Sequence, residues 1–413
     1  MNSASSTVTP VDVNPAAMST HAVAGSYNLA VGYLRAFITL LVLAHHAALA
    51  YHPVAPSPPA TLVAQPRWWQ AFPVVDPQRC SGFSLFVGFN DIFFMALMFF
   101  LSGLFVYRSI ERKGMKTFLR DRLLRLGLPF VVAAAVVAPL AYYPAYLLTA
   151  SPTGFAGFWQ QWLALGNWPA GPAWFIWLLL AFDAVAALLF AIAPRCIGWL
   201  ATATSQVSRR PIALYALIST LSAVAYIPLV FRVGPERWSS FGPFTFQTGR
   251  PLHYLVYFLV AVGVGAYGLR QGLFVSDGKL ARRWPLWVSA MILCYFLVVA
   301  TFLAMLSGKN PGMHWPLLLA ISWVLSCAVS CFGFMALFAR FATRRIAMFD
   351  SLTDNAYGMY LIHYAFVSWL QYAMLRFAMP GLAKGLLVFL GTVLLSWGTV
   401  AALRRIPAVA RVI

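Results

Sequence analysis

The first long apolar stretch of the chain carries two ionisable side chains, Arg35 and His46, eleven residues apart. An α-helix turns by about 100° per residue, so both side chains lie within about 20° of one face and about 16 Å apart along the axis. Histidine exchanges a proton readily near neutral pH. The spacing favours His46, rather than the rotated His45, as a reactive histidine; the alternative is a hydrogen-bonded packing residue.

Three further ionisable residues lie in or beside apolar stretches, where they are costly to bury and mark function. Asp91 lies at a depth that matches His46, so a His46–Asp91 pair would fix the imidazole tautomer during general-base catalysis. The alternative is a helix cap formed by Asn90 and Asp91. Asp183 either pairs with an arginine that the sequence does not identify or is protonated. His363 either lines a cavity or makes structural hydrogen bonds.

The composition decides what kind of protein positions these residues. Of 413 residues, 61% are hydrophobic and 9% charged, against about 45–50% and about 25% in soluble domains. This excludes a soluble globular enzyme, a disordered chain and a fibrous protein. Stretches of about 20 apolar residues can cross a bilayer. We count ten of them: 28–50, 88–107, 127–148, 173–194, 211–231, 251–270, 284–306, 314–339, 355–376 and 382–403.

The net charge of +19 is distributed unevenly between alternate loops. One set of loops, together with the C-terminal tail, holds 20 Lys and Arg residues, and the other set holds 8. Such a bias marks the cytoplasmic side of a membrane protein, so it predicts cytoplasmic termini and disfavours a nucleic-acid partner. We expect an all-α, polytopic inner (plasma) membrane protein with a disordered tail (1–26), a transmembrane domain (27–405) and a short cytoplasmic tail (406–413).

The largest share of the basic residues falls in the run from Arg108 to Arg125. Its amphipathic pattern is typical of an interfacial helix held by anionic membrane lipid. The alternative is a clamp for a phosphate-bearing cytoplasmic cofactor, formed by Arg120, Arg122 and Arg125. The five cysteines have no metal-site spacing, so we expect no metal.

Gly263, Gly265 and Gly268 spell GxGxxG, the pattern of a dinucleotide-binding turn. That turn must follow a β-strand. Here the glycines lie inside an apolar stretch, so we interpret them as a site of close helix packing.

Four stretches together resemble the acyltransferase-3 family of membrane acyltransferases. They are YLRAFITLLVLAHH, which contains an Arg-x10-His pattern, MALMFFLSGLFVYRS at 95–109, FLRDRLLRLGLP at 118–129 and YGMYLIH at 357–363. Their order and spacing span nearly the whole chain. The stretches FFLSG and WFIWLLL (174–180) are similar to the glucan-modifying branch of the family.

The resemblance implies about ten helices and transfer of an acyl group from cytoplasmic acyl-CoA, either acetyl-CoA or succinyl-CoA, with no permanently bound cofactor. The acceptor would be a hydroxyl of an envelope carbohydrate, glucan or lipid. It implies that His46 is the catalytic general base or acyl carrier, with Arg35 as its companion. We assign Asp91 to the catalytic group, although many members place their acidic residue nearer the Ser-Gly pair. On the donor side we place Arg120, Arg122, Arg125 and His363.

Two other functions compete with this interpretation. A secondary transporter or exporter of a sugar or lipid would suit ten spans with buried charges, but it predicts inverted repeats, and the two halves show no obvious repeat. A non-catalytic scaffold would leave Arg35 and His46 on one helix face unexplained. The sequence does not identify the acceptor, the acyl chain or the oligomeric state.

Overall fold

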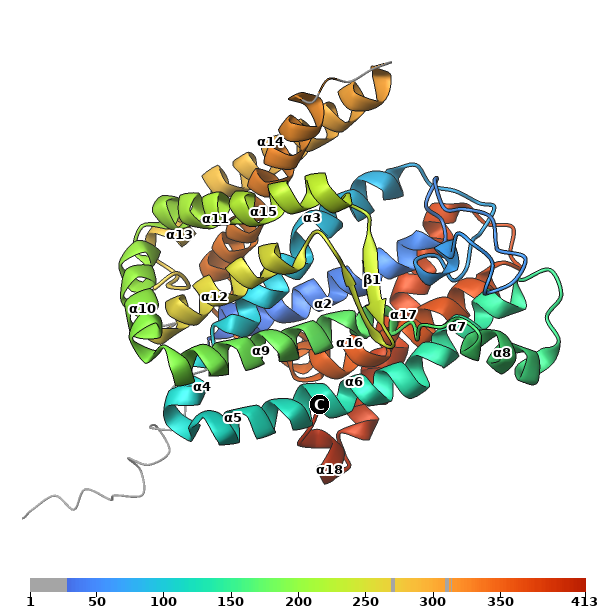
Figure 1. The fold of residues 1–413 in the computed structure, drawn as a ribbon, viewed down its shortest axis with the longest axis horizontal. Coiled ribbons are helices and arrows are strands. Elements are labelled where there is room, and N and C mark those ends of the chain that lie inside the picture. Colours follow the sequence, from blue (N-terminus) through green and yellow to red (C-terminus); the bar gives the residue numbers. More distant parts are fainter. Residues whose placement is uncertain (1–27, 269–271, 309–311, 313) are drawn as a thin grey trace, which may run out of the picture.

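The computed structural model describes residues 28–268, 272–308, 312 and 314–413, so the predicted tail, 1–26, lies outside the described part. Within it, the chain is a bundle of long helices with one small hairpin (Figure 1). The first half contains α2 (Leu29–Leu49), α3 (Gly82–Gly103), α4 (Val106–Lys113), α5 (Met115–Arg122), α6 (Leu128–Val132), α7 (Ala138–Leu147), α8 (Gly154–Leu163), α9 (Trp174–Ile192) and α10 (Pro194–Ser208). The second half contains α11 (Pro211–Val233), β1 (Trp238–Phe241), β2 (Phe244–Gln247), α12 (Pro251–Tyr267), α13 (Lys279–Arg282), α14 (Trp284–Ser307), α15 (His314–Phe341), α16 (Ala347–Met374), α17 (Gly381–Leu403) and α18 (Pro407–Ala410).

Eight helical segments of the described residues are long and apolar enough to cross a membrane. They start at Leu29, Gly82, Met115, Gly171, Pro211, Trp284, His314 and Gly381. The sixth and ninth predicted stretches correspond to α12, which is a shorter apolar helix, and to α16, which carries more polar residues. The all-α, polytopic fold with about ten spans is therefore confirmed.

The third span differs from the prediction because it starts at Met115 rather than near residue 127. Gly114 has a positive φ of 75°, which separates α4 from α5 and splits the predicted amphipathic helix in two. From α5 the chain continues to α7 through π-helical turns at Leu123–Gly127 and Ala133–Val137. Such turns widen the helix locally. The C-terminal part of the basic run, from Met115 onwards, therefore belongs to the third membrane span.

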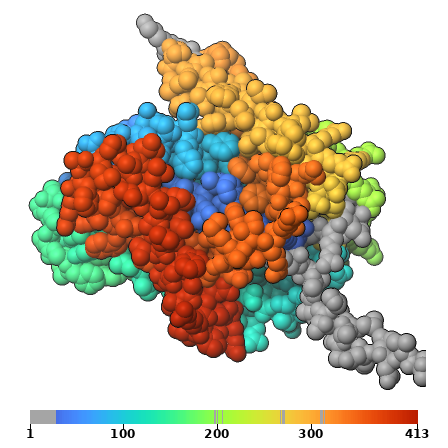
Figure 2. Space-filling view, turned by 180° about the vertical axis from the view of Figure 1, so that it is seen from behind, coloured from blue at the N-terminus to red at the C-terminus, as the bar shows by residue number. Residues whose placement is uncertain are grey.

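The central helix of the bundle is α2, which packs against α3, α15, α16 and α17. Figure 2 shows only a small blue patch of α2 between the light-blue, orange and red segments that surround it. Its buried side chains include Leu34, Ile38 and Leu43, which are fully covered. Most residues on α2 are therefore buried against other helices.

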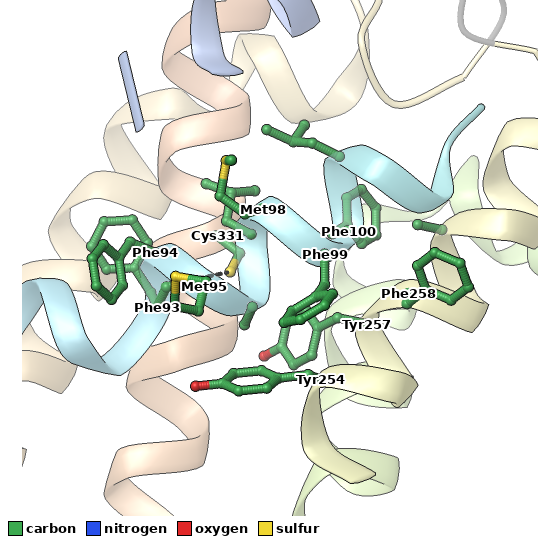
Figure 3. Packing of buried hydrophobic residues seen from close by; sticks show 14 of the residues in the cluster. Phe93, Phe94, Met95, Met98, Phe99, Phe100, Tyr254, Tyr257, Phe258 and Cys331 are labelled. Carbon is green, nitrogen blue, oxygen red and sulfur yellow. Dashed lines mark hydrogen bonds between the residues drawn. The ribbon is translucent and has the colours of Figure 1, made fainter. Parts of the chain in front are cut away.

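The pairing of α3 with α12 depends on two glycines. A Cβ atom at Gly103 would collide with the carbonyl oxygen of Phe258, and one at Gly265 with that of Leu104. Around them, aromatic side chains of both helices interlock, as Figure 3 shows, with the rings of Phe99 and Tyr254 stacked at 5.1 Å. Close helix packing is therefore the role of Gly265 in the GxGxxG pattern.

The loop between α2 and α3, residues 50–81, is fastened to the C-terminal end of α2. Its Asp76 forms a fully buried ion pair with Lys384 of α17, with 2.6 Å between Oδ2 and Nζ. Arg79 donates to the carbonyl oxygens of Ala50, His52 and Ala55. This loop therefore covers the end of the helix that carries His46.

Candidate active site

The site is centred on two histidines from helices far apart in the sequence. His46 lies in the last turn of α2 and His363 in the middle of α16. The Nε2 atom of His363 lies 3.3 Å from Nδ1 of His46, and the ring centroids are 5.1 Å apart. His363 is fully buried, whereas His46 is only partly buried. Of the two, His46 has the more exposed side chain.

The backbone around the two rings determines their tautomers. Nδ1 of His363 lies 2.7 Å from the carbonyl oxygen of Tyr360, which can only accept, so this nitrogen carries the proton. Its Nε2 is then an acceptor. Nδ1 of His46 faces that acceptor and, at 2.9 Å, the carbonyl oxygen of Val42, so it must donate. A neutral His46 is therefore left with a basic lone pair on Nε2, which is the atom that can take a proton.

Side chains of α16 also hold the backbone of α2. Gln371 donates from Nε2 to the carbonyl oxygens of His46, at 2.8 Å, and Ala47, at 3.2 Å. At the other end of α2, the hydroxyl of Tyr33 donates to Asp350 Oδ1 at 2.9 Å. The ring of Tyr364 packs edge-on against His46 at 5.1 Å. The position of His46 relative to α16 is thus fixed at both ends of α2.

Arg35 lies near the start of α2, two residues after Tyr33, and its side chain is exposed. His45, the neighbour of His46, points instead towards α3, where its ring packs against Phe94 at 5.2 Å. The rotation of about 100° between successive residues thus gives the two histidines different neighbours. The preference for His46 over His45 as the reactive histidine stays a prediction, and this difference supports it.

The proposed pairing of Asp91 with His46 is wrong for this structure. Asp91 instead forms a bidentate ion pair with Arg250, with 2.6 Å between Nη2 and Oδ2 and 3.0 Å between Nη1 and Oδ1. Arg250 also donates to the backbone carbonyl oxygen of Asp91. Burial disfavours the charge on Arg250, but Asp91 outweighs it and raises the pKa of Arg250 well above its usual value. The physical reason is that α12 packs against α3 and brings a buried arginine, a stronger partner than a neutral imidazole.

Asp183, for which the sequence offered no partner, lies beside Arg122, with 3.2 Å between Oδ2 and Nε. Asp183 is fully buried, and the guanidinium of Arg122 lies over the ring of Phe118 at 5.0 Å. Arg120 and Arg125 are exposed. The three arginines of the predicted phosphate clamp therefore differ, because only Arg122 forms an ion pair with this buried carboxylate among the described residues.

Sequence reasoning missed His363 as the neighbour of His46, since it assigned His363 to the donor side. It also missed Gln371 and Lys384. One signal was available: Tyr360, His363, Tyr364 and Gln371 recur at helical spacing and give α16 a polar, aromatic stripe within an apolar stretch. Among the described residues, no three His, Cys, Asp or Glu side chains cluster as metal ligands would.

A bundle of apolar helices with a histidine pair held between α2 and α16 defines a multi-pass membrane protein with a site suited to proton transfer. The chain belongs to the acyltransferase-3 family, whose model, described as an acyltransferase domain, matches residues 28–401. No curated protein and no solved structure matches the chain. The family covers the histidine pair and nearly the whole chain, so the protein is a membrane acyltransferase.

Proposed function

We propose that this protein transfers an acetyl or succinyl group from acyl-CoA to a hydroxyl of an envelope carbohydrate, glucan or lipid, at the inner (plasma) membrane. His46 is the general base. The observation that carries this proposal is the fixed tautomer of His46, which leaves Nε2 as a base on a side chain that is only partly buried. His363 positions His46 and stabilises the imidazolium that forms on His46. The aspartate of a Ser-His-Asp triad has the same role towards its histidine.

The reaction balances without a metal or redox partner. The acceptor hydroxyl gives its proton to Nε2 of His46 while its oxygen attacks the thioester carbonyl carbon. The tetrahedral intermediate then collapses, the C–S bond breaks, and the CoA sulfur leaves with the proton returned by His46. In the alternative, His46 takes the acyl group first as an acyl-imidazole, and the hydroxyl attacks that intermediate.

The donor would approach from the predicted cytoplasmic side. CoA carries phosphates, which bind well to arginine. Arg120 and Arg125 are exposed there, and Arg122 orders the same helix through Asp183. We infer that the first two contact the phosphates and that Arg122 has a mainly structural role.

The acceptor would approach from the opposite side, over the loop 50–81. A pocket of about 270 Å³ in this loop is lined by Ser57, Gln65, Trp68 and their neighbours. Trp68 is 55% exposed and offers a flat aromatic face, which suits the apolar face of a sugar ring. The loop is hydrogen-bonded to Ala50, one turn beyond His46. These features favour a carbohydrate acceptor.

The test is to compare envelope glycans and lipids by mass spectrometry from cells that produce the protein, cells that lack it, and cells that produce His46→Ala. We expect a mass gain of one acetyl or succinyl group only with the unaltered protein. An unchanged modification pattern in cells with His46→Ala would refute the role of His46. The absence of an acetyl or succinyl mass gain in cells that produce the unaltered protein would refute the proposed donor and acceptor.

A further inference from the structure

A series of buried aromatic rings connects the pocket in the loop 50–81 to the histidine pair. Trp69 lines that pocket, and its ring meets the ring of Tyr142, on α7, edge-on at 5.2 Å. Tyr142 in turn meets Tyr364, on α16, edge-on at 5.6 Å. Tyr364 then packs edge-on against His46 at 5.1 Å. Three consecutive ring contacts therefore lead from the wall of the pocket to His46.

A hydrogen bond ties the middle of this series to the backbone of the loop. The hydroxyl of Tyr142 donates to the carbonyl oxygen of Gln70 at 2.9 Å. Gln70 is the last residue of a short 3₁₀ turn, Trp68–Gln70, that also carries Trp69. The indole Nε1 of Trp69 donates to the carbonyl oxygen of Leu62, which holds its ring against the loop. A displacement of this turn would therefore act on Tyr142 through both its hydroxyl and its ring.

Tyr364 is closely confined on the side of Tyr142. Gly171, in the connection before α9, has a positive φ of 55°. A Cβ atom there would lie 3.2 Å and 3.3 Å from two ring carbons of Tyr364 and 3.4 Å from the hydroxyl oxygen of Tyr142. Closely packed side chains transmit a displacement to their neighbours. A shift of Tyr142 is therefore passed to Tyr364 and from there to His46.

These rings belong to a hydrophobic cluster separate from the main core. Its buried members come from the loop 50–81, α7, α8 and α16. In Figure 1 the loop, coloured blue, lies beside α7 and α8 at one end of the bundle. The backbone N–H of Leu62 donates to Gln161 Oε1 of α8 at 2.8 Å, which joins the loop to this cluster. The wall of the pocket and the ring beside His46 thus pack together.

We propose that Tyr142 is a positioning residue for acyl transfer, which transmits the position of the turn Trp68–Gln70 through Tyr364 to the ring of His46. This inference rests on the proposed function, in which His46 is the base and the loop 50–81 receives the acceptor. A sugar ring stacked on Trp68 would hold the turn in place and, through the rings behind it, align His46 with the acceptor hydroxyl. Alignment of a reacting group raises kcat.

The experiment uses the full-length protein purified in detergent, with labelled acetyl-CoA or succinyl-CoA as donor. The acceptor probe is the envelope glycan fraction extracted from cells that lack the protein. Tyr142→Phe removes the bond to Gln70 and keeps the ring. We expect its kcat to fall about tenfold while the KM for acyl-CoA stays unchanged, because alignment is lost and the donor site is untouched.

The matched control is Tyr146→Phe, one turn further along α7. Its hydroxyl is also removed from a buried ring, but that hydroxyl contacts Thr153 and not the loop 50–81. This variant should keep the kcat of the unaltered protein. The thermal unfolding temperature of each variant checks the fold. A loss of kcat in Tyr146→Phe equal to that in Tyr142→Phe would overturn the proposal, because the effect would then be a general one on the cluster.

A second substitution tests whether Tyr142 acts through Tyr364. Tyr364→Leu removes the ring beside His46 and should itself lower kcat. In that background Tyr142→Phe should have no further effect, because the ring through which it acts is gone. Independent losses that multiply in the double variant would contradict the proposed route. Should Tyr364→Leu fail to fold, the comparison of Tyr142→Phe with Tyr146→Phe still decides the role of Tyr142.

His46→Ala in the same assay separates this inference from the proposed function. Transfer by His46→Ala at the unaltered rate would refute His46 as the base, and with it the proposed function. Loss of transfer in His46→Ala together with an unchanged kcat in Tyr142→Phe would refute the role of Tyr142 alone. Loss in both, with Tyr146→Phe active, is the result that we expect.

Discussion

Nε2 of His363 accepts from the imidazole of His46 across 3.3 Å, although 317 residues separate them along the chain. The contact joins the reactive ring to a second, fully buried imidazole. The neutral imidazole of His363 orients the ring of His46 by accepting a hydrogen bond from it, and it brings no net charge into the membrane.

Replacing His46 with Ala should lower acyl transfer by about 10²–10⁴-fold, because the general base is lost. Transfer from acyl-CoA to the acceptor by the purified protein measures this, and the thermal unfolding temperature checks the fold. His45→Ala is the matched control, since His45 faces Phe94 on α3, and it should keep most activity. If His45→Ala were the inactive variant, the assignment of the base would be reversed.

Replacing His363 with Leu should lower kcat by up to about 10²-fold and leave the KM for acyl-CoA nearly unchanged, because it acts through His46 and not on the donor. Gln offers an amide acceptor at a similar position, so His363→Gln should recover part of the lost rate. Steady-state kinetics of both variants measure the effect. A large rise in KM with an unchanged kcat would return His363 to the donor-binding role that the sequence suggested.

The clamp arginines should separate into two groups. Arg122→Gln strands the buried carboxylate of Asp183 and should lower the free energy of unfolding by roughly 2–3 kcal/mol. Adding Asp183→Asn should restore most of that loss. Chemical unfolding in detergent measures both, and additive losses in the double variant would argue against the pair.

Arg120→Gln with Arg125→Gln should instead raise the KM for acyl-CoA by roughly tenfold, because phosphate contacts are lost. Stability should not change, since both side chains are exposed. Added salt should reduce the difference between this variant and the unaltered protein, because exposed charges are screened. An unchanged KM at low salt would place the CoA phosphates elsewhere.

The ion pair between Asp76 and Lys384 should dominate the stability of the loop 50–81. Lys384→Met leaves a fully buried carboxylate and should cost about 3–5 kcal/mol of unfolding free energy. The double variant Asp76→Leu, Lys384→Met removes both charges and should recover most of it. Limited proteolysis of the loop gives a local measure, and faster cleavage in the single variant than in the double variant is the expected order.

The sequence was informative where the signal is local. Apolar runs predicted about ten spans, and the rotation between successive helical residues separated His46 from His45. The absence of a preceding strand in the sequence indicates that the glycines of the sixth stretch are packing residues, and a Cβ atom at Gly265 would indeed collide with the backbone of Leu104. Each of these inferences needs only a helix and its immediate neighbours in the chain.

The contacts between distant helices were not predictable. Asp91 and Arg250 are 159 residues apart, and nothing in either stretch indicates that α3 and α12 pack closely enough to join them. From the sequence, depth in the membrane alone suggests a pair between Asp91 and His46. The start of the third span was misplaced for a related reason, since Arg122 looks like a surface charge until α9 brings Asp183 to it.

The bonds from Tyr33 and Gln371 fasten α2 to α16 near both ends of α2. These bonds oppose separation of the two helices and keep the histidines at a fixed distance from each other. Access of donor and acceptor by displacement of other parts, such as the loop 50–81, would leave these bonds intact. A mechanism in which α2 and α16 rock apart to expose the site alternately to each side would have to break both fastenings in every turnover.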